Sequence, residues 1–457
     1  MKNYPAEIFK AYDIRGVVET SLTPEVVEII GIVLGNMAIE ENVKGLVVGY
    51  DGRLTSPMLA KRLIAGILLA GCDVCDIGVV TTPMVYFANY QLKTYSGVMI
   101  TGSHNPPEYN GLKMVINGDT LANDRIQEIK KRMEKGKYKK NGKGKYYDID
   151  IKESYIEKIV ADIKLSRPLS ILVDAGNGVA GKIAPTLYRR MGAKVLGLYC
   201  EVDGNFPNHH PDPSKLENLV DLIKAVEVSD AEFGLAFDGD GDRLGIVTKD
   251  GMVIYPDRQM MLFAAEILNK NPRAKILYDV KSSRLLGEWI KKHGGEPIMC
   301  KTGHSLVKAK IKETGALLAG EMSGHIFFND RWYGCDDGVY AGARMLEILS
   351  QVEDPSALLN SLPNSISTPE INIQVKEGEQ HKLVEKIQKI AKFKDAIEII
   401  TTDGIRVEYP DGFGLVRASN TTPVLVLRFE ADSESGLKRI KEQFRKIISP
   451  LVSIVEF

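Results

Sequence analysis

Hydrophobic residues in the first third of the chain form short continuous runs separated by stretches with helical periodicity. The runs at 45–51 and 72–80 are typical of buried strands, and helices are expected over 23–41 and 56–70. Each helix is opened by a hydroxyl residue followed by proline, which is a common start signal. Repeated strand–helix units predict a mainly parallel sheet covered by helices on both faces.

The same pattern restarts twice and then changes. A strand and glycine turn at 169–178 lead into a second cycle, and a third cycle starts at Pro256. From about Thr368 the chain reads as strands with helices over 380–392 and 433–448, which predicts a small antiparallel α+β domain. The expected fold is therefore α/β: three related domains with mixed, mainly parallel sheets, and a fourth domain of another kind. The expected boundaries are 1–150, 151–253, 254–366 and 367–457.

Composition limits the classes of partner and location. Among 457 residues, 59 Lys and Arg nearly balance 60 Asp and Glu, so no global field favours nucleic acid or an anionic membrane. The Lys- and Gly-rich segment 130–150 lacks periodicity and is expected to be a solvated connector, with nucleic-acid contact as its alternative. Apolar runs such as 63–72 are too short to span a bilayer, the start has no signal-peptide core, and five cysteines suit a reducing cytoplasm. We expect a cytoplasmic protein without nucleic-acid or membrane partners, monomeric by default.

The sequence Asp238-Gly-Asp-Gly-Asp-Arg243 follows a predicted strand. Carboxylates at alternate positions, with glycines that let the backbone fold tightly, can direct several hard oxygens at one cation. An EF-hand is excluded, because that loop needs Gly and Glu where Arg243 and Lys249 stand. The incomplete ligand set favours Mg²⁺ shared with a phosphate, which Arg243 could reach; the alternative is a solvated acidic turn.

Two further loops carry candidate binding groups. Arg417-Ala-Ser-Asn-Thr-Thr-Pro423 combines a guanidinium, hydroxyls and an amide without an acid, which suits a phosphate dianion rather than a plain polar hairpin. In Gly320-Glu-Met-Ser-Gly-His325, the residues Glu321, Ser323 and His325 would face one side if the segment is extended. That side could bind sugar hydroxyls, although an ordinary loop explains the residues as well.

A competing signal is Gly176-Asn-Gly-Val-Ala-Gly181, a G-x-G-x-x-G match between a strand and a helix, with Glu201 twenty positions on. It predicts a dinucleotide site and an NAD-linked oxidoreductase. Asp174 opposes this interpretation, because its charge would repel a pyrophosphate at the first glycine. The glycines equally suit close packing of strand and helix.

The segment Thr101-Gly-Ser-His-Asn-Pro-Pro107 ends an apolar run and exposes Ser103, which by itself fits a plain turn. Together with "FKAYDIRG" (9–16), "DGDGDR", "GEMSGH" and "RASNTTP" in this order, it resembles the α-D-phosphohexomutase family, in its phosphomannomutase/phosphoglucomutase branch. The resemblance covers essentially the whole chain. It implies three related α/β domains and a TATA-binding-protein-like C-terminal domain around a central cleft.

The resemblance also implies a function and a role for each motif residue. A phosphate would move reversibly between the 1- and 6-positions of mannose and glucose phosphates, through a phosphoserine and a hexose 1,6-bisphosphate intermediate or activator. Ser103 would be that phosphoserine, and an oxygen of it would complete the Mg²⁺ site. The residues implied by the motifs are Ser103, His325, Lys113, Arg15 and His104 for catalysis; Ser103, Asp238, Asp240 and Asp242 for the metal; and Tyr12, Arg243, Lys281, His304, Glu321, Ser323, His325, Arg417, Ser419, Asn420 and Thr421 for the substrate.

Other functions stay open at this point. Phosphoglucosamine mutases usually carry Gln in place of Met322 and Ala in place of Gly102, so both residues favour the mannose/glucose branch. A non-catalytic sugar-phosphate binding protein would keep the Arg417 loop without needing Ser103 or the aspartates.

Overall fold

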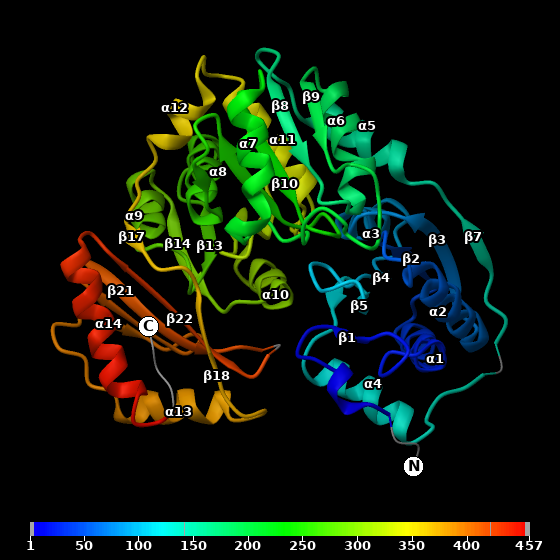
Figure 1. The fold of residues 1–457 in the computed structure, drawn as a ribbon. Coiled ribbons are helices and arrows are strands. Elements are labelled where there is room, and N and C mark those ends of the chain that lie inside the picture. The colour runs from blue at the N-terminus through cyan, green and yellow to red at the C-terminus, as the bar shows by residue number, and fades with distance from the viewer. Residues whose placement is uncertain (1–3, 141, 421, 453–457) are drawn as a thin grey trace. The chain divides into compact units, whose positions relative to one another are not determined.

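The computed structural model describes residues 4–140, 142–420 and 422–452. It consists of two compact units, one formed by Met1–Pro256 and Ser323–Ser361 and the other by Asp257–Met322 and Leu362–Phe457. Figure 1 gives the helices and strands of both units.

The first unit begins with a mixed sheet in the order β1-β5-β4-β2-β3-β7, in which β6 pairs with β5. Strands β2, β3, β4 and β7 are parallel, whereas β5 runs antiparallel to β1 and β4. The strands are β1 (Ile14–Val17), β2 (Gly45–Tyr50), β3 (Asp73–Val79), β4 (Gly97–Ile100), β5 (Tyr109–Ile116), β6 (Asp119–Thr120) and β7 (Tyr146–Asp148); the helices are α1 (Pro24–Glu40), α2 (Ser56–Ala70), α3 (Thr82–Gln91) and α4 (Asp124–Glu134), after a 3-10 turn at Ala6–Ile8. The expected strands and helices of this part are confirmed, and Thr23 caps α1 by accepting a hydrogen bond from the Val26 amide.

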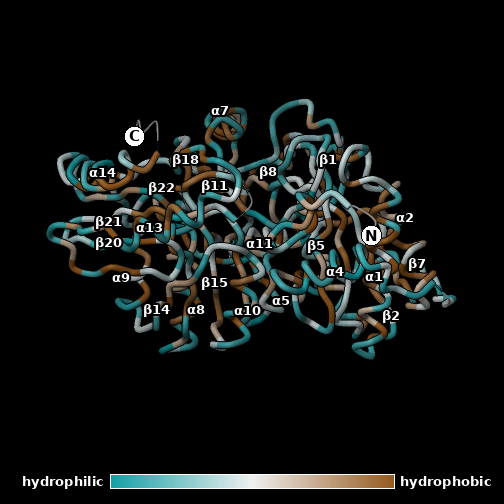
Figure 2. The backbone as a smooth tube through the Cα atoms, turned by 90° about the horizontal axis from the view of Figure 1, so that it is seen from below, coloured by the Kyte–Doolittle hydropathy of each residue, from teal (hydrophilic) through white to brown (hydrophobic). Residues whose placement is uncertain are grey.

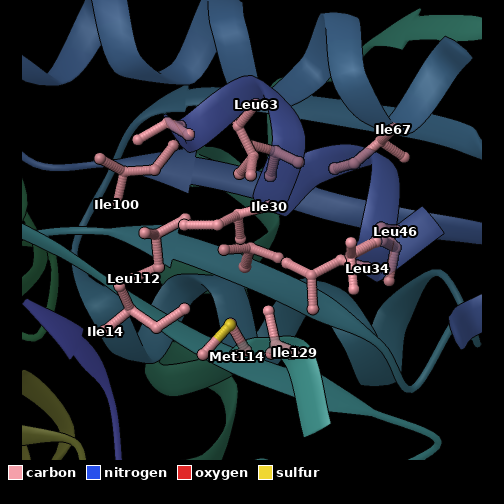
Figure 3. Packing of buried hydrophobic residues seen from close by; sticks show 14 of the residues in the cluster. Ile14, Ile30, Leu34, Leu46, Leu63, Ile67, Ile100, Leu112, Met114 and Ile129 are labelled. Carbon is pink, nitrogen blue, oxygen red and sulfur yellow. The ribbon is translucent and has the colours of Figure 1, made fainter. Parts of the chain in front are cut away.

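The hydrophobic core of this sheet is packed between strands and helices (Figure 3). Ile30 and Leu34 of α1 and Leu63 and Ile67 of α2 are fully buried together with residues from the sheet. Burying a side chain of this size contributes about 1.5–3 kcal/mol. The sheet that carries Ser103 is therefore held by a continuous apolar layer.

The segment 130–150 differs from the expected solvated connector. Its first residues complete α4, whose Ile126, Ile129 and Met133 are buried at helical spacing, and its last residues form β7 on the edge of the sheet. The apolar positions of α4 begin before the Lys-rich run, and the three residues of β7 are exposed. Neither element therefore left a hydrophobic pattern inside the segment.

The first unit contains a second mixed sheet in the order β12-β11-β10-β8-β9. Strands β8, β9 and β10 are parallel, and β10 continues into the antiparallel β11 through the loop 238–243, called the acidic loop below. The elements are β8 (Ser170–Asp174), β9 (Lys194–Leu198), β10 (Phe233–Phe237), β11 (Leu244–Thr248), β12 (Val253–Ile254) and β16 (Ile326–Phe328), with α5 (Lys152–Asp162), α6 (Ala184–Arg190), α7 (Val220–Val228), α11 (Gly338–Leu349), α12 (Pro355–Asn360) and 3-10 turns at Val179–Lys182 and Leu216–Leu219.

The second unit joins a parallel sheet segment, β14-β13-β15, to an antiparallel C-terminal sheet. Its elements are β13 (Lys275–Asp279), β14 (Glu296–Cys300), β15 (Leu318–Gly320), β17 (Ile366–Ser367), β18 (Ile371–Gln374), β19 (Glu398–Ile400), β20 (Ile405–Tyr409), β21 (Gly412–Ala418) and β22 (Val424–Ala431), with α8 (Pro256–Lys270), α9 (Arg284–Lys292), α10 (His304–Thr314), α13 (Gln380–Ile390) and α14 (Glu434–Ile448). Hydrophobic and hydrophilic residues alternate along α14 (Figure 2), which buries Leu437, Ile440, Phe444 and Ile448. The expected α+β domain at the end of the chain is confirmed.

Among the described residues, no helix combines the length and the apolar character that crossing a bilayer requires.

Candidate active site

Ser103 lies in the turn that follows strand β4, in a backbone conformation that is uncommon for serine. Its φ is 49°, and its side chain is almost completely buried. Such a left-handed residue costs about 1–3 kcal/mol and persists only where the surrounding structure holds it. The Ser103 amide donates to Thr101 Oγ1 at 2.7 Å, while Ser103 Oγ donates to Asp238 Oδ2 at 3.0 Å and lies 3.1 Å from His104 Nδ1. The turn thus directs the hydroxyl at the acidic loop.

Asp238, Asp240 and Asp242 occupy the tight turn between β10 and β11, and all three are fully buried. One carboxylate oxygen from each lies within 4.8 Å of the others. Asp238 Oδ1 accepts the amides of Asp242 and Arg243, both at 3.1 Å, which fixes the turn from inside. Asp240 Oδ2 accepts the hydroxyl of Thr82 at 2.5 Å. The three side chains therefore converge as their alternate spacing predicted.

Lys113, on β5, provides a positive charge inside this cluster. Its Nζ lies 2.7 Å from Asp240 Oδ2 and 2.5 Å from Asp242 Oδ2. Burial opposes the charged ammonium, but the attraction of Asp240 and Asp242 outweighs burial and raises the pKa of Lys113. Burial would also raise the pKa of both carboxyls, but in Asp242 the attraction of Lys113 reverses the effect and holds the pKa well below its usual value. Lys113 is thus a charged partner of the cluster.

The cluster has the chemistry of a site for a small divalent cation. Burial, together with the carboxylates of Asp242 and Asp240, raises the pKa of Asp238 well above its usual value, because a further negative charge beside them is unfavourable without an additional cation. Asp240 Oδ1 is buried and has no hydrogen-bond partner among the described residues. Hard, buried carboxylate oxygens of this kind match the ligand preference of Mg²⁺.

Arg243 and His325 form a second group at the same turn. Their backbones pair in an isolated bridge, and Arg243 Nε lies 3.3 Å from His325 Nε2. His325 Nε2 is also 3.3 Å from Asp242 Oδ1, while Ser323 Oγ lies 3.0 Å from His325 Nδ1. Arg243 additionally faces Asp212 Oδ1 at 3.7 Å and Asp238 Oδ2 at 3.8 Å. The Arg243 guanidinium and the His325 imidazole are therefore held beside the carboxylates of the acidic loop.

The amino-terminal motif reaches the Ser103 loop through Arg15. Arg15 lies on β1, pairs with Asp13, and donates from Nη1 to Asn105 Oδ1 at 2.5 Å. Tyr12 is half-buried just before β1. Burial, followed by the positive charges of Arg243 and Arg15, lowers the pKa of His104 well below its usual value. Arg15 and His104 thus join the same unit as Ser103 and Lys113, and Tyr12 lies just before the strand that carries Arg15.

In the second unit, the predicted residues Lys281, His304 and Glu321 are buried and follow successive strands of one sheet. Lys281 Nζ pairs with Glu370 Oε2 at 2.9 Å, and Glu321 Oε1 accepts the Gly303 amide at 2.5 Å just before His304 begins α10. The segment after Gly320 is a turn, so the assumption of an extended Glu321–His325 stretch is wrong. Gly324, with φ of 102°, turns the backbone there.

The segment 417–423 of the second unit, called the arginine loop below, is held by a carboxylate that the sequence did not identify. Arg417, on β21, donates from Nε to Asp403 Oδ2 at 2.9 Å, and the same oxygen accepts the Thr302 amide at 3.1 Å. Ser419 Oγ lies 2.9 Å from Thr422 Oγ1, and Asn420 is half-buried next to it. Thr421 lies outside the described residues. Asp403 thus connects the arginine loop to the loop that carries His304.

Other supporting residues were missed at the carboxyl end of β2. Asp51 and Arg53 follow this strand directly, and both are buried against the Ser103 loop. Their signal was present, because a charged pair directly after a buried parallel strand lies at the edge where neighbouring strands also end. The continuous apolar run identified the strand but gave no partner for these charges.

The G-x-G-x-x-G segment is used for packing. Asp174 Oδ1 accepts the Gly176 amide at 2.8 Å, and His209 Nε2 lies 3.0 Å from Asp174 Oδ2. A Cβ atom on Gly178 would lie 2.8 Å from the carbonyl oxygen of Gly239 in the acidic loop. The glycines therefore allow two backbones to touch, and the first one is covered by His209 rather than open to a pyrophosphate.

Four family models together match nearly the whole chain: phosphoglucomutase/phosphomannomutase alpha/beta/alpha domain I at residues 6–140, domain II at 153–251, domain III at 255–366, and the C-terminal domain at 370–447. The chain belongs to this family, the α-D-phosphohexomutases. The four boundaries expected from the sequence stay a prediction.

Individual relatives agree with the family over nearly full length. The chain is 56% identical to a phosphoglucomutase of Neisseria gonorrhoeae over 98% of both chains, and 54% identical to a phosphomannomutase/phosphoglucomutase of Pseudomonas aeruginosa over 96% of this chain and 95% of that one. A crystal structure of a phosphoglucomutase/phosphomannomutase family protein from Burkholderia thailandensis superposes with a TM-score of 0.93 at 53% identity, covering 98% of both chains. The prediction of a hexose phosphate mutase is confirmed, and neither the glucosamine nor the NAD-linked alternative is favoured.

Proposed function

We propose that this enzyme moves a phosphate reversibly between the 1- and 6-positions of glucose and mannose phosphates, with Ser103 as the phosphoryl carrier. The observation that carries the proposal is the position of Ser103 Oγ, 3.0 Å from Asp238 Oδ2 at the edge of a buried cluster of carboxylates. Phosphoryl transfer depends mainly on positioning and charge neutralisation. A hydroxyl beside a cation-binding cluster and the cations Lys113 and Arg243 meets both needs.

In the proposed cycle, a sugar hydroxyl attacks the phosphorus of phosphorylated Ser103. A new P–O bond to the sugar forms while the bond to Ser103 Oγ breaks; the sugar hydroxyl loses its proton to a nearby base, and the leaving Ser103 Oγ takes up a proton. Transfer of the other phosphate of the resulting hexose 1,6-bisphosphate back to Ser103 restores the phosphoenzyme. His325, Lys113, Arg15 and His104 are the candidates for holding the proton, and the charged state of Lys113 suits it to donate rather than accept.

Asp238, Asp240 and Asp242 are proposed to hold Mg²⁺ together with an oxygen of the phosphoserine. When bound, the ion would neutralise charge on the transferring phosphoryl group. The residues themselves would keep the carboxylates fixed: Lys113 pairs with Asp240 and Asp242, and Thr82 donates to Asp240.

The remaining motif residues are proposed to bind the sugar phosphate. Arg417, Ser419, Asn420 and Thr421 would hold the phosphate that is not being transferred, because a guanidinium with several hydroxyl and amide donors matches a dianion. Glu321 and Ser323 would bind sugar hydroxyls at carbons 3 and 4, which mannose and glucose share. The proposed supporting contacts to substrate come from Tyr12, Arg243, Lys281, His304 and His325.

The decisive test is the intact mass of the protein before and after incubation with glucose 1,6-bisphosphate and Mg²⁺. We expect a gain of one phosphoryl group in the wild type and in Ser435→Ala, an exposed control. We expect no gain and no turnover in Ser103→Ala. A gain retained by Ser103→Ala, or no gain in the wild type, contradicts the proposal.

Substrate choice has its own measurement. Rates on glucose 1-phosphate and mannose 1-phosphate should be comparable, and the rate on glucosamine 1-phosphate should be low. A dominant rate on the glucosamine ester would reject the mannose/glucose assignment while leaving the phosphoserine mechanism intact.

A further inference from the structure

Arg53 lies directly beneath the Ser103 loop and bonds to its backbone. The side chain is fully buried after strand β2. Nη2 donates to the carbonyl oxygens of Ser103 at 2.8 Å and Asn105 at 2.6 Å, and Nη1 donates to those of Pro106 at 2.6 Å and Tyr109 at 3.0 Å. One guanidinium thus satisfies four carbonyl groups of the turn that carries the reactive hydroxyl.

Asp51 closes the same loop from the other end. Its Oδ2 lies 3.2 Å from Arg53 Nε and also accepts the hydroxyl of Thr101 at 2.8 Å and the amide of Gly102 at 3.2 Å. The turn is therefore held on the side before Ser103 by the Asp51 carboxylate, which accepts hydrogen bonds. At Ser103 and after it, the turn is held by the Arg53 guanidinium, which donates them. This pair explains how a non-glycine residue stays at a φ of 49°.

The space around the guanidinium is closed on further sides. Its Cζ lies 5.1 Å from the centre of the Phe206 ring, and a Cβ atom on Gly102 would lie only 2.5 Å from Cζ. The side chain therefore has little freedom to change position. Lysine could supply the charge at this place, but its single ammonium group lacks the planar fork that reaches four acceptors.

We propose that Arg53 is a positioning residue for phosphoryl transfer: it fixes the Ser103 turn so that the hydroxyl faces the acidic cluster, and it acts on turnover rather than on substrate affinity. The inference rests on the proposed role of Ser103. Arg53 bonds to backbone carbonyls of the turn, so its replacement removes none of the candidate substrate-binding side chains. A displacement of about 1 Å in a reacting group lowers a rate about 100-fold.

Arg344 provides the matched control, because it is an equally buried arginine in the same unit. It pairs with both carboxylate oxygens of Asp330, at 3.0 Å and 2.9 Å, and lies over the ring of Phe328. Asp330 and Phe328 both lie outside the Ser103 turn. A loss of stability common to any buried arginine should therefore occur in Arg53→Met and Arg344→Met alike.

The experiment compares Arg53→Met, Arg53→Lys and Arg344→Met in the full chain. Measurements are urea unfolding, kcat and KM for glucose 1-phosphate per folded enzyme, and the rate of phosphate gain from glucose 1,6-bisphosphate by intact mass. We expect all three variants to lose stability. In Arg53→Met, kcat and the rate of phosphate gain should fall about 100-fold, with KM within about threefold of the wild-type value. In Arg53→Lys, kcat should fall at least about tenfold. Arg344→Met should keep both rates.

Each outcome is decisive. A folded Arg53→Met with kcat within about threefold of wild type, a loss confined to KM, or an equal loss in Arg344→Met overturns the inference. If Arg53→Met does not fold, Arg53→Lys decides, and normal turnover in that variant also overturns it. Failure of the wild type to gain phosphate at Ser103 would instead refute the proposed function, so the two failures are distinguishable.

Discussion

Gly239 is the point at which the acidic loop touches the backbone of the Ser103 turn. A Cβ atom at this position would lie 2.4 Å from the carbonyl oxygen of Ser103, and ordinary contacts begin at 3.4 Å. The glycine has no positive φ, so alanine is acceptable to its own backbone. Gly239→Ala therefore tests the distance between the two loops and little else.

The size of the effect follows from that distance. Relieving the contact requires a separation of about 1 Å between the Ser103 carbonyl and the acidic loop, because 3.4 Å less 2.4 Å must be gained. Overpacking of this kind destabilises a fold by about 1–3 kcal/mol. A shift of about 1 Å between a reacting hydroxyl and its charged partners lowers kcat about 100-fold. We expect the loss of turnover to exceed what the loss of folded protein explains.

The assay combines urea unfolding with kcat and KM for glucose 1-phosphate. The matched control is Gly197→Ala in β9, where a Cβ atom would meet only the side chain of Cys200, at 3.2 Å. This control should retain turnover. A Gly239→Ala enzyme that unfolds like wild type and turns over within about threefold of it would refute the close approach of the two loops as a requirement for catalysis.

Three further predictions concern charge. Lys113→Met leaves Asp240 and Asp242 without their buried cationic partner. In the presence of a chelator, the free energy of unfolding should fall by about 3–5 kcal/mol, measured as a lower melting temperature. Mg²⁺ should stabilise this variant more than the wild type, and equal Mg²⁺ responses would contradict the prediction. Burial raises the pKa of Asp337 to about 7, so between about pH 4 and 7 the folded state holds a proton that the unfolded state has lost. Raising the pH from about 4 to 7 should therefore lower the free energy of unfolding of the wild type relative to that of Asp337→Asn. An unchanged difference between the two proteins at pH 5 and 8 would refute this. Asp403→Ala removes the acceptor of Arg417 and the Thr302 amide, so KM for glucose 1-phosphate should rise about tenfold or more with a smaller change in kcat, whereas a loss confined to kcat would contradict a role of Asp403 in binding.

The proposed reactive groups could be located from the sequence because each stands at the end of a hydrophobic strand. Ser103 follows β4 and Asp238 follows β10, and the burial of these strands is visible as continuous apolar runs. Alternate carboxylates with glycine between them predict the converging carboxylates of Asp238, Asp240 and Asp242 without a structure. The candidate site positions are therefore encoded locally.

The supporting groups are not encoded locally. Arg53 meets carbonyls about fifty positions away, and Asp403 meets the Thr302 amide about a hundred positions away. Hydrophobic periodicity assigns a residue to a strand or a helix, but it does not say which distant backbone accepts its hydrogen bonds. Strand β7 was not predicted for a related reason: its exposed residues carry no burial pattern, and its pairing with β3 is a tertiary contact.

The glycine motif that suggested a dinucleotide site packs against the acidic loop, which in turn packs against the Ser103 turn. Gly178 lies against Gly239, since a Cβ atom on Gly178 would lie 2.8 Å from the Gly239 carbonyl oxygen, and Val179 donates its amide to that oxygen at 3.2 Å. Gly239 in turn lies against the Ser103 carbonyl, and Arg53 holds that carbonyl from another direction. Three loops from two sheets are therefore in backbone contact, with glycine wherever two of them meet. A side chain at Gly178 would press on the backbone of Gly239, so we expect it to change the distance between Ser103 and the carboxylates of the acidic loop.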